Sequence, residues 1–162
     1  MKIRNSKAGA FLLASAFCSF LLVSCDKDDD TAARSQEYNL QQEGNNGVTG
    51  KLRVSENADK TFNLRVTLNK SVKDTVHLLR LYNGSLNDEG VLALSLNNIT
   101  GNGGAVSSET LSIKKLKGAD NTEIQLTYDS ILKYNAYLHV LYSATKSDSI
   151  ISKGNLFKSA GN

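Results

Sequence analysis

The chain is poor in residues that form covalent cross-links or bind metals. Its 162 residues include two cysteines, two histidines and no proline. Both cysteines, Cys18 and Cys25, lie within the first 25 residues, so the remaining chain has none with which to form a disulfide. Two histidines without a cysteine fall short of the three or four ligands that zinc and copper sites normally use. We therefore predict no metal site and no cofactor, and a fold stabilised by an ordinary apolar core.

Sequence patterns of common catalytic sites are also missing. There is no Gly-x-Ser-x-Gly motif for a serine nucleophile, and most acidic residues stand in turn-like contexts. The Gly-rich segment 101–104 is followed by neither a Lys-Ser/Thr pair nor a helical pattern, which predicts a tight loop between strands rather than a phosphate site. We therefore expect no enzymatic activity.

The first 25 residues have the pattern of a bacterial export signal that ends in a lipobox. Three basic residues precede an uncharged apolar run over residues 8–23, and the small Ser24 comes directly before Cys25. The apolar run is shorter than the roughly 20 residues that a membrane-spanning helix needs. We predict that residues 1–24 are a lipoprotein signal peptide, that Cys25 is acylated, and that the mature protein meets the membrane through this lipid.

An acidic run, residues 26–30, follows Cys25 directly. Like charges repel and keep a segment extended, so one interpretation is a solvated tether over residues 25–36. The run also resembles the acidic export signal of surface-exposed lipoproteins of the Bacteroidetes type. That resemblance implies a lipid-anchored protein on the outer membrane, exposed at the cell surface.

The mature chain is electrically neutral and long enough for one domain. Removal of residues 1–24 leaves 138 residues. The precursor has a net charge of +3, and the removed segment holds three basic and no acidic residues, so the mature net charge is zero. No basic cluster remains, and we expect no binding to nucleic acid.

Alternating apolar and polar residues dominate from Tyr38 onward, which predicts an all-β fold. Segments 48–54, 61–69, 91–96 and 123–127 alternate in this way, and Gly- and Asn-rich turns separate the runs. Many short strands at this spacing predict one antiparallel β-sandwich of seven to nine strands over residues 37–158. The predicted core positions are Phe62, Leu64, Val66, Leu92, Leu94, Leu138 and Val140.

Two segments, 76–82 and 136–142, are apolar at successive positions. Such runs are typical of central strands that are covered on both faces. Between them, residues 128–134 are predicted to form one short helical turn with Ile131 and Leu132 directed inward.

Five segments of the predicted domain carry a resemblance to a known family: 80–85, 90–96, 100–104, 137–144 and 150–156. Through these segments, the stretch 38–157 resembles the chordin-type (CHRD) domain of secreted and lipid-anchored bacterial proteins. It implies an immunoglobulin-like or superoxide-dismutase-like β-sandwich without a settled molecular activity. The histidines of the family motifs correspond here to Arg80, Tyr82 and Leu141, and His139 stands where the family has Asn. A site built on three facing imidazoles is therefore not expected in this chain.

Outward-facing basic and aromatic residues give the remaining candidate site. Lys51, Arg53 and Arg65 share the outward phase of two early strands, where they form either a solubilising surface or part of a binding face. The full candidate binding face comprises Lys51, Arg53, Arg65, Arg80, Tyr82, Tyr137 and His139. We predict a surface-anchored, non-enzymatic binding or structural domain with a glycan or protein ligand. The alternative, suggested by fold analogy alone, is a metal-dependent oxidoreductase-like enzyme.

Overall fold

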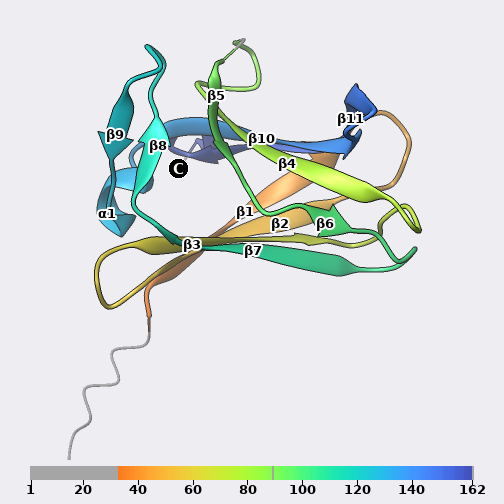
Figure 1. The fold of residues 1–162 in the computed structure, drawn as a ribbon, viewed down its shortest axis with the longest axis horizontal. Helices are drawn as coiled ribbons and strands as arrows, with labels where there is room; N and C mark the ends of the chain where they lie inside the picture. The colour runs from red at the N-terminus through yellow and green to blue at the C-terminus, as the bar shows by residue number, and fades with distance from the viewer. Residues whose placement is uncertain (1–32, 89, 162) are drawn as a thin grey trace, which may run out of the picture. The chain divides into compact units, whose positions relative to one another are not determined.

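The computed structural model describes residues 33–88 and 90–161, and these form an antiparallel, almost all-β structure (Figure 1). Its strands are β1 (Ser35–Gln42), β2 (Gly50–Glu56), β3 (Phe62–Leu68), β4 (Val76–Asn83), β5 (Leu92–Ser95), β6 (Ile99–Thr100), β7 (Val106–Ile113), β8 (Lys115–Lys117), β9 (Glu123–Gln125), β10 (Asn135–Ser143) and β11 (Lys146–Phe157). A single turn of helix, α1 (Tyr128–Ile131), and a short 3₁₀ helix, η1 (Lys158–Ala160), complete the structure.

One curled sheet supplies both layers of the sandwich. Its strand order is β5-β4-β10-β11-β1-β2-β3-β7, with β6 paired to β4 and with β8 and β9 forming a small separate sheet. Figure 1 shows β1, β2, β3 and β7 in one layer and β4, β5, β10 and β11 in the other. The layers are joined where Gln41 and Gln42 of β1 pair with Lys153 and Ser152 of β11. The predicted all-β sandwich is confirmed.

The core lies between the two layers and follows the predicted alternation on β2 and β3. Leu52 and Val54 on β2 are fully buried, while the residues beside them face outward. On β3 all four apolar residues, from Phe62 to Leu68, are buried. Tyr38 of β1 and Phe157 of β11 fill the space between the layers with an edge-to-face contact at 5.3 Å between ring centroids.

The predicted core register of β5 is wrong at Leu92. The side chain of Leu92 is 39% exposed, whereas its neighbour Ala93 is buried and Leu94 is only partly buried. The cause is a bulge in β5, because Leu81 pairs with Leu94 and Tyr82 with Leu92, so that Ala93 has no partner on β4. An extra residue in one strand reverses the inward and outward phase beyond it, which simple alternation does not anticipate.

The predictions for the centre of the chain are confirmed for β10 and the helical turn but not for β4, which was expected to be covered on both faces and instead alternates, with Val76 exposed and Tyr82 partly exposed on its outward side. Strand β10 lies between β4 and β11 and buries three successive residues, Ala136, Tyr137 and Leu138. Helix α1 begins with a capping box between Thr127 and Ser130, and it directs Ile131 into the core.

The folded part begins earlier than the predicted boundary at residue 37. Ser35 and Gln36, assigned to the tether from the sequence, pair with Ser55 and Val54 of β2. Arg34 contacts the carboxylates of Glu56 and Asp129 at 2.6 and 2.7 Å. The predicted signal peptide and Cys25 lie outside the described residues. Within residues 33–88 and 90–161, no helix has the length and apolarity required to cross a membrane.

Candidate functional site

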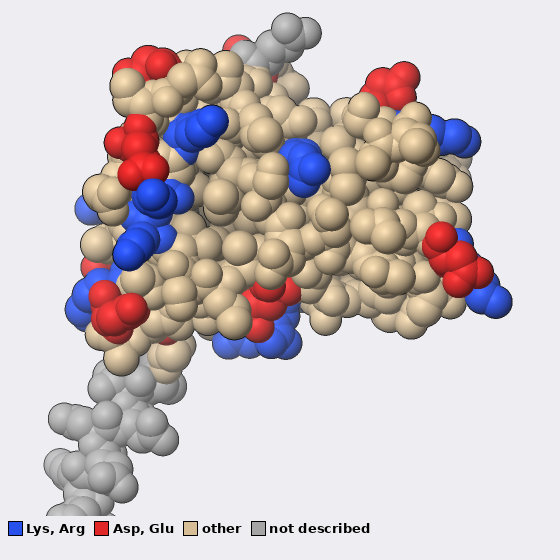
Figure 2. All heavy atoms as spheres, viewed as in Figure 1, with Lys and Arg blue, Asp and Glu red and all other residues tan. Residues whose placement is uncertain are grey.

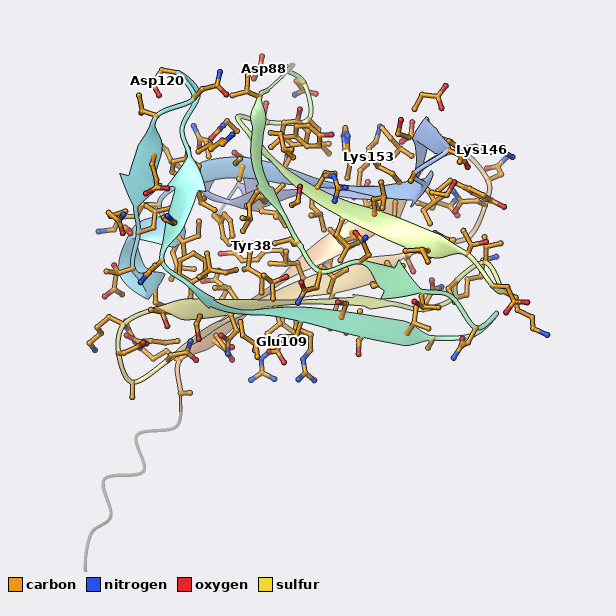
Figure 3. All side chains as sticks on the ribbon, viewed as in Figure 1. Tyr38, Asp88, Glu109, Asp120, Lys146 and Lys153 are labelled. Atoms are coloured by element: carbon orange, nitrogen blue, oxygen red, sulfur yellow. The ribbon has the colours of Figure 1, made fainter. Side chains whose placement is uncertain are left out.

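The residues predicted to form one binding face are divided between the two outer surfaces of the sandwich. Arg53 of β2 lies opposite Arg65 of β3, whereas Arg80 and Tyr82 of β4 lie opposite His139 and Tyr137 of β10. The inward residues of both layers share one core, so these two groups point away from each other. Figure 3 shows this separation, with Glu109 and Lys153 projecting from opposite layers. The prediction that Lys51, Arg53 and Arg65 lie close to Tyr137 is therefore wrong.

The first surface, here called the polar face, consists of the outward residues of β1, β2, β3 and β7. Its basic side chains have local partners. Lys51 contacts Glu37 at 2.9 Å, and Arg65 contacts Glu109 at 2.7 Å, across neighbouring strands. Arg53 donates a hydrogen bond to the hydroxyl of Ser35 at 2.9 Å. These paired, exposed charges match the solubilising surface that the sequence left as one alternative.

The second surface is formed by outward residues of β4, β10 and β11 and is here called the aromatic face. Its members are Leu78, Arg80, Tyr82, Tyr137, His139, Leu141, Lys153 and Asn155. The rings of Tyr82 and Tyr137 stack with centroids 5.2 Å apart and planes 13° from parallel. His139 is tilted against both rings, with its centroid 5.2 Å from that of Tyr82 and 5.0 Å from that of Tyr137. Three aromatic rings from two strands thus meet on an outer surface.

A row of three nitrogen-bearing side chains crosses this face beside the tyrosines. Arg80 pairs with His139 across β4 and β10, and His139 pairs with Lys153 across β10 and β11. Partial burial lowers the pKa of His139, the positive charge of Lys153 lowers it further, and Glu43 acts in the opposite direction. Lys153 in turn contacts Glu43 at 2.5 Å.

The loop between β4 and β5 holds part of the aromatic face in place. Gly90 donates its backbone N–H to the hydroxyl of Tyr137 at 3.1 Å, and Leu86 donates to Oδ1 of Asn155 at 2.8 Å. A Cβ atom at Gly90 would lie 1.8 Å from the carbonyl oxygen of Asn83, so the loop needs glycine at this point. Tyr137 is only 5% exposed, whereas Tyr82 and His139 are partly exposed. A ligand would therefore meet Tyr82 and His139, with Tyr137 supporting them.

The other histidine, His77, is part of the core. It is fully buried, its Nδ1 lies 2.8 Å from the carbonyl oxygen of Tyr142, and its Nε2 accepts the N–H of Val72 at 3.2 Å. A carbonyl only accepts hydrogen bonds, so these partners assign the proton to Nδ1 of a neutral ring. Both ring nitrogens are used, which leaves His77 no nitrogen for a metal.

Charged and exposed apolar side chains are unevenly spread over the rest of the surface. Figure 2 shows acidic and basic side chains gathered at the end formed by α1, β8 and β9, and few over β4, β5 and β6. Val76 on β4 is exposed, as are Val91 and Leu92 at the start of β5. Val91 and Leu92 also line a pocket of about 450 Å³, which β8 and β9 close on the other side.

In the part of the chain that the structure describes, no three His, Cys, Asp or Glu side chains gather as metal ligands would.

Comparisons of the chain with protein-family models, with curated proteins and with solved structures give no match. The resemblance to the chordin-type domain therefore stays a prediction. Four members of the aromatic face were missed from the sequence, two of them polar, Lys153 and Asn155. These two become neighbours of His139 and Tyr137 only through the pairing of β10 with β11, and the alternation within β11 carried no signal for a site.

Proposed function

We propose that this chain is a surface-anchored lipoprotein of the outer membrane whose β-sandwich is a non-enzymatic binding domain, and that its ligand binds the aromatic face. The observation that carries the proposal is the contrast between the two outer surfaces. The basic residues of the polar face are held by Glu37, Glu109 and Ser35, whereas the aromatic face presents a three-ring cluster beside Arg80.

Aromatic and arginine side chains supply much of the binding energy at protein surfaces, because they offer large contact areas at a small cost in conformational entropy. On this face the cost is already reduced. Stacking fixes the ring of Tyr82 against Tyr137, whose hydroxyl is held by Gly90. A ligand would therefore meet a surface that needs little further ordering.

A binding experiment with two matched variants tests the location of the site. The full-length protein in detergent is applied to an array of glycans and extracellular proteins. The double variant Tyr82→Ala, His139→Ala should lose the signal of any bound ligand, while Lys51→Ala, Arg53→Ala on the polar face should keep it. The opposite result, with binding lost only in the polar-face variant, would refute the assignment.

The lipid anchor is tested separately. In cells that produce Cys25→Ala, the protein should leave the membrane fraction, and mass spectrometry should show no acylated N-terminus. A variant that stays in the membrane fraction with unchanged mass would contradict the proposed anchor. Protease treatment of intact cells then reports exposure at the surface, because only a chain outside the outer membrane is accessible.

A further inference from the structure

We infer that the aromatic face recognises an acidic saccharide, with the carboxylate of a uronic acid at Arg80 and its pyranose ring against Tyr82. This inference rests on the proposed function, since it names the ligand class of the same site. It follows from the chemistry of two adjacent rows of side chains. The charged row is Arg80, His139 and Lys153, and the neighbouring row is Tyr82, Tyr137 and Asn155.

Arg80 is the group on this face best suited to a carboxylate. Its guanidinium donates to the carbonyl oxygen of the adjacent Leu79 at 3.1 Å, and no carboxylate of the described residues lies within 4 Å of it. Arg34 and Arg65 differ, because each contacts an acidic side chain. A planar guanidinium matches a carboxylate in shape and donates two parallel hydrogen bonds, so an acidic ligand would supply a partner that this region of the face lacks.

The other two members of the charged row have supporting roles. Lys153 is already paired with Glu43, which reduces the charge it can offer to a ligand. His139 stands between the two cations and its ring remains partly exposed. The neutral imidazole donates or accepts one hydrogen bond to a sugar hydroxyl, and the protonated ring adds a positive charge.

Tyr82 supplies the contact for the sugar ring. One face of a pyranose presents C–H groups with partial positive charge, which are attracted to the electron-rich face of an aromatic ring. Tyr82 is partly exposed and Arg80 is close enough to influence its phenol electrostatically. Asn155 lies in the same row, and because its Oδ1 accepts from Leu86, its amide NH₂ is directed to other acceptors, such as a sugar hydroxyl.

Isothermal titration calorimetry with a full-length protein in detergent tests the inference. The probes are an oligomer of galacturonic acid, its methyl ester and a neutral oligogalactan of the same length. We expect the acid to bind at least about tenfold more tightly than the ester, because the ester carries no negative charge and so loses a charge-assisted hydrogen bond to Arg80. Arg80→Gln should abolish this difference, Tyr82→Ala should weaken binding of all three probes, and Arg53→Gln on the polar face should change nothing.

The pH dependence gives a second readout. The groups facing His139 are Arg80, Tyr82, Tyr137, Lys153 and, through Lys153, Glu43. Because burial and Lys153 lower the pKa of His139 from its ordinary value of 6.5, affinity for the acid should rise only as the pH falls below 6.5, where His139 gains a charge while the uronate stays ionised, and His139→Gln should remove this rise.

The outcomes separate this inference from the proposed function. Equal affinity for acid and ester, lost in Tyr82→Ala, would overturn the acidic specificity and leave the binding face in place. Acid binding that survives Tyr82→Ala and Arg80→Gln but is lost in Arg53→Gln would refute both. Absence of binding to all three saccharides would overturn the inference alone, because the array of proteins and glycans decides the proposed function independently.

Discussion

Replacing Leu138 by alanine should destabilise the domain far more than the same change at Leu92. Leu138 is fully buried in the middle of β10, between Leu81 on β4 and Gly154 on β11. The substitution removes three carbon groups, which at about 0.8 kcal/mol each gives about 2.4 kcal/mol for transfer alone. Gly154 has no side chain to fill the space, so we expect a cavity and a total loss of about 3–5 kcal/mol.

Leu92→Ala is the matched control, because it removes the same atoms from a side chain that is 39% exposed. Its cost should stay below about 1 kcal/mol. Urea unfolding of the chain from residue 26 onward, followed by circular dichroism, measures both values, and equal slopes against urea concentration would show that the same surface is exposed on unfolding. Similar losses in the two variants would refute the bulge in β5 and the inward register of β10.

Three further changes test other parts of the structure. His77→Ala should cost about 3 kcal/mol or more in urea unfolding, because it leaves a cavity and two unpaired backbone groups; a loss below 1 kcal/mol would contradict the buried role of His77. Tyr38→Phe should leave the free energy of unfolding unchanged or raise it by up to about 1 kcal/mol, since the buried Tyr38 hydroxyl has no hydrogen-bond partner among residues 33–88 and 90–161; a clear loss would reveal a partner. Hydrogen bonds from Arg34 lower the pKa of both Glu56 and Asp129, so this contribution is present above about pH 4 and lost as the pH falls through the lowered values. Arg34→Ala should therefore lower the melting temperature more at pH 6 than at pH 2.5, and an equal effect at both would contradict the ion pairs.

The sequence predicts strands β2 and β3 better than it predicts the candidate functional site. The alternation on β2 and β3 is confirmed because one face of each strand is buried and the other is in water. At β5 a single unpaired residue, Ala93, reverses the phase, and nothing in the local pattern marks it. The bulge depends on how β5 aligns with β4, and the alternation within β5 does not contain that alignment.

The candidate site depended on pairings between distant parts of the chain. Arg80 and Tyr82 were correctly grouped with Tyr137 and His139, since both segments are apolar central strands that become neighbours. Lys51, Arg53 and Arg65 were grouped with them wrongly, because outward phase alone does not say on which layer a strand lies. That assignment follows from the order of strands in the sheet, which the alternation does not contain.

The pairing of β1 with β11, here called the seam, affects when the protein can fold during its synthesis. The first strand of the fold pairs with the last one, and the hydroxyl of Ser152 donates to the carbonyl oxygen of Gln41 across 111 positions of the chain. Neither the seam nor the neighbouring pairing of β10 with β11 forms until nearly all of the chain has been synthesised. Such distant contacts slow folding, since a long loop must close before they contribute. If the proposed signal peptide directs export, this delay benefits the chain, because it keeps the chain unfolded and able to pass through a narrow channel until its final strand has crossed.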